Sequence, residues 1–159
     1  MPSVHVMKNA QGKLEGFGER GAKTYQRFLK ACKELEPGEL LSFSFKVPRS
    51  PRFHRLHFVV LRALFDSQEQ FSSDYEFRKW TEVGAGHVKF VPGPTGRMVA
   101  LPMSIAYDAL DDIAFGELHA KVKDFMRSEH AQKFLWPHLT AHQQWETVEQ
   151  VLAEFEGGR

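Results

Sequence analysis

The spacing of hydrophobic and polar positions changes several times along this chain, and each spacing predicts a different element. Residues 4–7 and 14–17 flank an Asn-Ala-Gln-Gly run, which is typical of a β-hairpin. A second hairpin is expected where residues 87–91 and 97–101 flank Pro-Gly-Pro-Thr-Gly. Between the two hairpins, residues 41–47 alternate between apolar and polar side chains, which predicts a half-buried central strand.

Helical spacing of apolar residues accounts for most of the remaining chain. Apolar side chains recur three and four positions apart, as in helices that pack one face against a core. The predicted helices begin near Ala22, Ser50, Asp74, Asp111 or Asp112, and Pro137, and the last one stops at Gly157-Gly158. Strands and helices are grouped rather than alternating, so the expected fold class is α+β. In this fold the two hairpins and the central strand form a mixed or antiparallel sheet, packed against four to five helices.

Length and composition indicate a single domain spanning residues 1–159. A hydrophobic fraction of 42% and a charged fraction of 26% are ordinary for a globular chain and exclude a disordered one. The single cysteine, Cys32, excludes an internal disulfide, and its place on an apolar helix stripe predicts a small core residue. The start of the sequence lacks a signal-peptide pattern and no apolar run is long enough to span a membrane, so we expect a cytoplasmic protein.

The net charge of +1 conceals an uneven distribution. Residues 1–62 contain 12 Lys and Arg against 5 Asp and Glu, a net charge of +7, whereas residues 63–159 contain 9 against 15, a net charge of −6. A basic N-terminal part joined to an acidic C-terminal part is a recognised sign of nucleic-acid contact. It is equally compatible with two parts whose electric fields cancel when the chain folds.

The strongest candidate site is the junction between the predicted central strand and the helix that follows it. Four cations and two histidines fall within residues 46–57, and Ser50-Pro51 marks the helix start. A helix N-terminus offers unpaired N–H groups and a positive dipole end to a phosphate. The candidate nucleic-acid-binding residues are Lys46, Arg49, Arg52, His54, Arg55 and Arg62.

These cations have two interpretations, which the sequence leaves open. Arginines at a helix N-terminus are repelled by the dipole, so their presence there indicates an acidic partner. That partner is either an external phosphate or a carboxylate from the acidic part of the same chain.

No motif of the chain demands a catalyst, although the sequence leaves an enzyme open. His138 and His142 have the spacing of two zinc ligands on a helix, but the Glu of a zinc-protease motif is missing, so we expect no metal site and no cofactor. The carboxylates of Asp108, Asp111 and Asp112 precede a helix and are typical of caps. A metal-dependent nuclease that uses them is the third function considered.

Several elements recur in the order found in one known family. They are the basic junction itself, Phe77-Arg78-Lys79-Trp80, the Val83-Gly84-Ala85-Gly86-His87 turn, Pro102-Met103-Ser104-Ile105-Ala106 and Asp111-Asp112-Ile113-Ala114-Phe115. Across residues 40–127 the chain therefore resembles an uncharacterised phage family, domain-of-unknown-function family 1367. The junction also has a looser likeness to the lambda NinB (Orf) recombination proteins. That likeness implies a dimeric, non-enzymatic mediator that engages single-stranded DNA and its binding protein, while residues 130–159 resemble nothing that indicates a partner.

These features predict a phage or prophage accessory protein of the host-cell cytoplasm. It is expected to bind nucleic acid, or a nucleic-acid-processing complex, through the basic junction and without chemistry of its own. The alternative is a protein-binding inhibitor of a host defence complex, similar to an anti-CRISPR protein.

Overall fold

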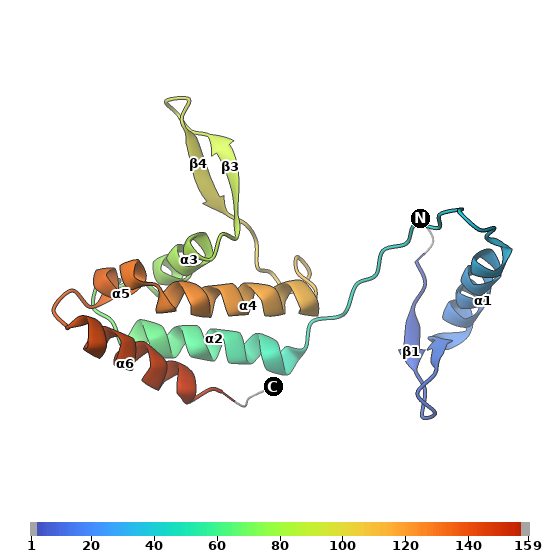
Figure 1. Ribbon diagram of the computed structural model, residues 1–159, viewed down its shortest axis with the longest axis horizontal. Coiled ribbons are helices and arrows are strands. Elements are labelled where there is room, and N and C mark those ends of the chain that lie inside the picture. The colour runs from blue at the N-terminus through green and yellow to red at the C-terminus, as the bar shows by residue number, and fades with distance from the viewer. Residues whose placement is uncertain (1–2, 157–159) are drawn as a thin grey trace. The chain divides into compact units, whose positions relative to one another are not determined.

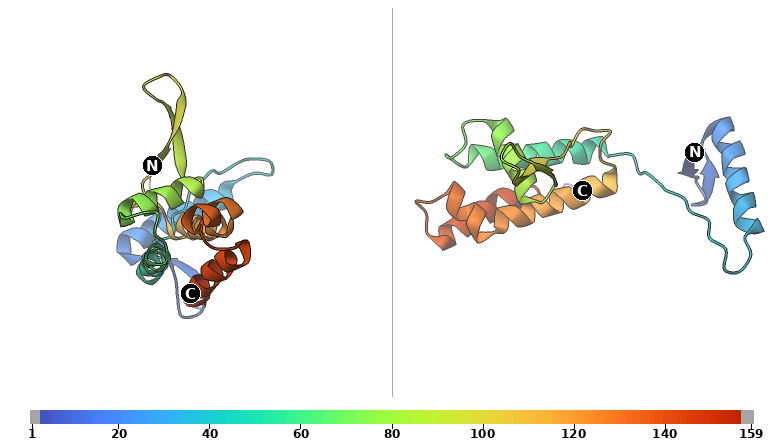
Figure 2. Two further views of the ribbon diagram at one scale, coloured as in Figure 1. Left: turned by 90° about the vertical axis from the view of Figure 1, so that its left-hand side faces the viewer. Right: turned by 90° about the horizontal axis from the view of Figure 1, so that it is seen from above.

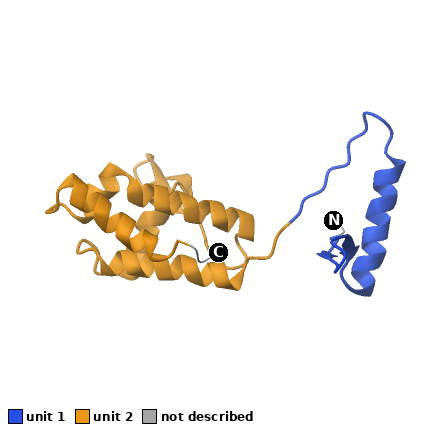
Figure 3. Ribbon diagram, turned by 60° about the horizontal axis from the view of Figure 1, so that its bottom comes forward, with its two compact units in different colours: residues 1–45 blue, residues 46–159 orange. Residues whose placement is uncertain are grey.

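The computed structural model describes residues 3–156. The chain forms two compact units, residues 1–45 and residues 46–159, which are described separately below (Figure 3). The sequence predicts one domain with a change of charge at residue 62. That position lies inside a helix of the second unit and marks no structural boundary.

The first unit is a β-hairpin followed by a helix, as predicted. Strands β1 (Val6–Lys8) and β2 (Leu14–Gly16) pair antiparallel, and helix α1 (Gly18–Glu34) follows them directly. The side-chain oxygen of Asn9 holds the hairpin turn by accepting hydrogen bonds from two backbone N–H groups further along the turn. Cys32 is exposed rather than in a core, because the short strands pack against the start of α1 and leave its end uncovered.

The prediction of a central strand at residues 41–47 is wrong. These residues have no regular secondary structure, and Phe43 and Phe45 are 68% and 73% exposed. A strand forms only where a neighbouring strand takes up its N–H and C=O groups, and alternation by itself does not supply that neighbour. In the described structure the two hairpins form separate two-stranded sheets. The α+β class is therefore confirmed, whereas one shared sheet is not formed.

The second unit is a group of helices from which one hairpin projects. Its elements are α2 (Pro51–Asp66), α3 (Asp74–Gly84), β3 (Val88–Pro92), β4 (Met98–Pro102), α4 (Asp112–Arg127), α5 (Glu129–Leu135) and α6 (Ala141–Ala153). Four of the helices and the hairpin confirm the prediction, and α5 was not expected. The last helix ends at Ala153, earlier than expected, and the predicted stop at Gly157-Gly158 lies outside the described residues.

Helices α2 and α4 run side by side in the same direction and enclose the core together with the other helices (Figure 1). Their buried positions recur at helical spacing, which is why the sequence predicted them. The buried core side chains include Val60, Leu64, Phe77, Phe115, Val122, Met126 and Val148. Hairpin β3–β4 projects from the helical layer (Figures 1 and 2). Within residues 3–156, no helix is long and apolar enough to cross a membrane.

Candidate functional site

Arg49, one of the predicted phosphate contacts, is buried, with 2% of its surface exposed. All five N–H groups of its guanidinium are used. Nε donates to the carbonyl of Leu110 at 3.2 Å, Nη1 donates to Ile105 O and to His54 Nδ1, and Nη2 donates to Ala106 O and again to Leu110 O. The guanidinium carbon also lies 4.0 Å from the centre of the Phe115 ring.

Arg49 therefore fastens the loop before α4 to the start of α2 and is not accessible to a phosphate. Its partners are backbone carbonyls rather than the carboxylates that the internal interpretation required. Burial lowers the pKa of the guanidinium, although the nearby carboxylates of Asp108 and Asp112 act in the opposite direction. The hydroxyl of Tyr107 closes the same loop by donating to the carbonyl of Arg49.

His54, a second predicted contact, is a neutral acceptor in this arrangement. A guanidinium can only donate, so the Nδ1 atom of His54, 2.9 Å from Nη1 of Arg49, must be unprotonated. Burial lowers the pKa of His54, and the positive charge of Arg49 lowers it further. The ring also contacts the aromatic rings of Phe58, Tyr107 and Phe115. His54 thus helps Arg49 to hold the loop before α4, and it adds no positive charge to a binding surface.

The sequence predicts that the N-terminus of α2 receives a phosphate, but hydrogen bonds within the protein cap this end of the helix. The backbone N–H of Ser50 donates to the carboxylate of Asp112 at 2.7 Å, and the N–H of Phe53 donates to the hydroxyl of Ser50. Pro51 at the first helical position has no N–H group. Just before the helix, the Lys46 ammonium donates to the carbonyl of Asp108 at 2.9 Å but remains exposed.

The remaining three arginines lie on the outer face of α2. Its exposed positions after the first residue are spaced three and four apart and form one stripe along the helix. This stripe, called the arginine stripe below, consists of Arg52, Arg55, Val59, Arg62 and Asp66. At 1.5 Å per residue its arginines extend over about 15 Å.

Only one arginine of the stripe has a carboxylate partner within the described chain. Arg62 pairs with Asp66 at 3.0 Å in an exposed i, i+4 ion pair. Among residues 3–156, neither Arg52 nor Arg55 takes part in an ion pair. The six candidate residues thus separate into two groups. Lys46, Arg49 and His54 contact the loop before α4, and Arg52, Arg55 and Arg62 face solvent.

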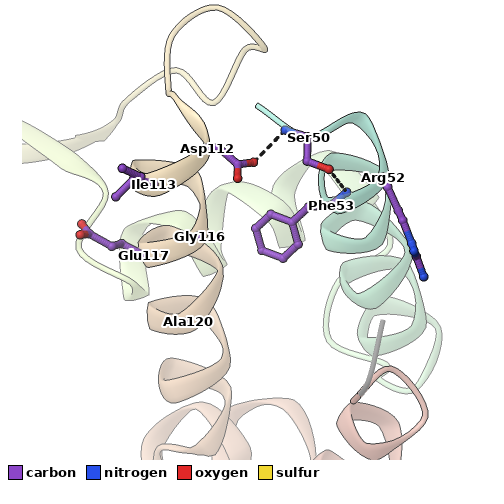
Figure 4. A pocket seen from close by; sticks show the side chains of 8 residues that line it. All are labelled: Ser50, Arg52, Phe53, Asp112, Ile113, Gly116, Glu117 and Ala120. Carbon is purple, nitrogen blue, oxygen red and sulfur yellow. Dashed lines mark hydrogen bonds between the residues drawn. The ribbon is translucent and has the colours of Figure 1, made fainter. Parts of the chain in front are cut away.

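A shallow, open groove of about 630 Å³ lies between the starts of α2 and α4 (Figure 4). The ring of Phe53 points into it, whereas Arg52 extends along the side of α2 turned away from α4. The lining residues are Ser50, Arg52, Phe53, Asp112, Ile113, Gly116, Glu117 and Ala120. Because the carboxylate of Asp112 faces α2 at one end of this groove, the groove is poorly suited to a phosphate.

Of the three acidic residues considered before α4, Asp111 caps this helix, whereas Asp112 accepts a hydrogen bond from the segment that begins α2. The carboxylate of Asp111 accepts from Ala114 N at 2.9 Å, and that of Asp112 accepts from Ser50 N. No group of three His, Cys, Asp or Glu in the described part of the chain could hold a metal ion. His142 is exposed and pairs with Glu146 at 3.1 Å.

Sequence reasoning missed the partners of Arg49, because they are carbonyls about sixty residues away in a loop without regular structure. No residue-type signal marks a carbonyl acceptor. Part of the arginine stripe could be predicted, because Arg52 and Arg55 are three residues apart and therefore share one helix face. Comparisons of the chain with family models, with curated proteins and with solved structures find no match.

Proposed function

We propose that this chain is a phage or prophage accessory protein that binds nucleic acid through the arginine stripe of α2, without chemistry of its own. The observation that carries the proposal is the exposure of Arg52 and Arg55, which have no carboxylate partner among the described residues. Two unpaired guanidinium groups on one helix face form a local positive potential, and phosphate oxygens are their best-matched external acceptors.

The dimensions of the stripe suit a nucleic-acid backbone. One strand of a duplex advances 3.4 Å per phosphate, so about 15 Å of helix corresponds to roughly four nucleotide steps. Arg52 and Arg55 supply the contacts at one end, and Lys46 adds an exposed ammonium before the helix. Contacts to phosphates position the protein on the nucleic-acid backbone but do not distinguish one base from another. We therefore expect binding with little sequence preference.

The biological setting of the proposal is the expectation that follows from the phage-family resemblance of residues 40–127. Within that setting the partner is nucleic acid, or a host complex that processes nucleic acid, in the host cytoplasm. The internal role of Arg49 and His54 narrows the binding residues to Lys46, Arg52, Arg55 and Arg62.

A fluorescence anisotropy titration with labelled single-stranded and double-stranded DNA of equal length tests the proposal. We expect binding at about 50 mM salt, and we expect log affinity to fall linearly with log salt concentration up to about 200 mM. Absence of binding to both DNAs at the lowest salt would contradict it.

The alternative, an inhibitor that binds a host defence protein, is favoured by one observation. Phe43 and Phe45 expose apolar rings that nucleic acid phosphates do not match. Capture from host lysate with and without nuclease treatment separates the two functions. A stoichiometric protein complex that survives nuclease supports the inhibitor, whereas loss of the captured material on nuclease treatment supports nucleic-acid binding.

A further inference from the structure

The hairpin β3–β4 projects from the second unit on a firm base. The backbone N–H of His87 donates to Glu82 O at 2.9 Å, and the N–H of Met103 donates to His87 O at 3.0 Å. The first bond joins the start of the hairpin to α3, and the second joins the two ends of the hairpin to each other. Beyond them the ribbon extends away from the helices (Figures 1 and 2).

One face of this ribbon is entirely apolar. Residues directly opposite each other in an antiparallel pair share a face, and the register places Val88 opposite Pro102, Phe90 opposite Ala100 and Pro92 opposite Met98. Phe90 is 65% exposed and Met98 is 59% exposed. A two-stranded ribbon with such a face is only marginally stable in water, which favours a partner that covers it.

The ribbon also lacks acidic residues, although it belongs to the acidic C-terminal part of the chain. Residues 83–107 contain Lys89 and Arg97 and no Asp or Glu. Each cation is the immediate neighbour in sequence of an exposed apolar residue, Lys89 of Phe90 and Arg97 of Met98. Lys89 lies opposite Leu101 on the other face of the ribbon, but its stem is long enough for the charged end to reach the edge of a ribbon only two strands wide. Neither cation takes part in an ion pair among residues 3–156.

We infer that this ribbon is a second nucleic-acid contact and that its ligand is a single strand, with an unstacked base against Phe90 and phosphates near Lys89 and Arg97. The inference rests on the proposed nucleic-acid function. A duplex presents phosphates and polar groove edges, because the flat faces of its bases are stacked inside. Of the two forms of nucleic acid, the single strand therefore offers both an apolar base face that can cover Phe90 and the negative charge that suits the two cations.

The experiment measures affinity for oligo(dT) and for a duplex of equal length with the full chain and three variants at Phe90. Phe90→Ala and Phe90→Leu should each weaken oligo(dT) binding about 5- to 150-fold, because both remove the aromatic face, and Phe90→Trp should retain it. Duplex affinity should not change in any of them. Thermal melts verify that the exposed substitutions leave the fold intact.

Two results would overturn the inference. One is oligo(dT) binding by Phe90→Ala equal to that of the unchanged protein. The other is an equal loss for oligo(dT) and duplex, which would indicate a general rather than a base-stacking contact. The proposed function fails separately, when the unchanged protein binds neither DNA at low salt.

Discussion

Nδ1 of His57 lies 2.9 Å from Nδ1 of His119, so a single hydrogen bond joins two buried imidazoles between α2 and α4. One ring donates and the other accepts, which requires that the pair is not doubly protonated. The rings also pack edge to face at a centroid distance of 5.2 Å. The contact between the two helices therefore requires that at least one of the two rings accepts through an unprotonated Nδ1.

Lowering the pH should destabilise the fold through His57. Burial, and then the neighbouring His119, lowers the pKa of His57 to about 3, and the pKa of His54 is lowered in the same direction. Below the unfolded-state pKa of about 6.5 the unfolded chain binds a proton that the folded chain does not bind. Stability is thus present above pH 6.5 and lost as the pH falls towards 3. For His57 the expected loss between pH 7 and pH 5 is about 2 kcal/mol, measured by urea unfolding at each pH.

The control for this prediction is His57→Gln, which cannot titrate. Its free energy of unfolding should change less between pH 7 and pH 5 than that of the unchanged protein. An identical pH dependence in the two proteins would show that other groups cause the acid sensitivity.

Replacing Arg49 by Lys should lower the free energy of unfolding by about 2–4 kcal/mol, although the charge is kept. An ammonium has three N–H groups and no planar fork, so carbonyls among Ile105, Ala106 and Leu110 would lose their donors in a buried site. Urea unfolding measures the change. The matched substitution Arg52→Lys, on the exposed stripe, should leave stability within about 0.5 kcal/mol. Equal effects at the two positions would refute the internal role of Arg49.

Gly84→Ala should destabilise the protein, although alanine ordinarily favours a helix over glycine by about 1 kcal/mol. A Cβ atom at Gly84 would lie 2.3 Å from ring atoms of Phe125, which itself packs against Trp80. Overpacking of this kind costs about 1–3 kcal/mol. A double-mutant cycle with Phe125→Leu tests the cause by thermal melting, because the loss should shrink once the ring is removed. A higher melting temperature for Gly84→Ala alone would contradict the geometry.

Elements with local signals could be predicted from the sequence. Ser50 followed by Pro51 marked the start of α2, and the Ser50 hydroxyl does accept from Phe53 N. Both hairpins followed from their turn residues. The helix α5 was missed, although Ser128 followed by Glu129 is a cap signal and the Ser128 hydroxyl accepts from Ala131 N.

Features that depend on distant partners could not be predicted. The alternation of residues 41–47 satisfies the pattern of a strand, but the structure provides no strand to pair with it. Arg49 and Arg52 look alike in the sequence, three residues apart in one basic run. Their roles differ because the loop that contains Ile105 and Leu110 surrounds only Arg49. This distinction between an internal and an exposed arginine determines which residues remain candidates for phosphate binding.

The salt dependence of DNA binding by the double variant Arg52→Ala/Arg55→Ala tests the role of the arginine stripe most directly. The slope of log affinity against log salt should become shallower by about 1.4–1.8, because each phosphate that an arginine neutralises contributes about 0.7–0.9 to it. The melting temperature should stay within a few degrees of that of the unchanged protein. The matched control is Lys30→Ala/Lys133→Ala, which removes two exposed cations that are paired with Glu34 and Glu129 and should leave the slope unchanged. A slope for the arginine variant equal to that of the unchanged protein would contradict the proposal that this stripe binds nucleic acid.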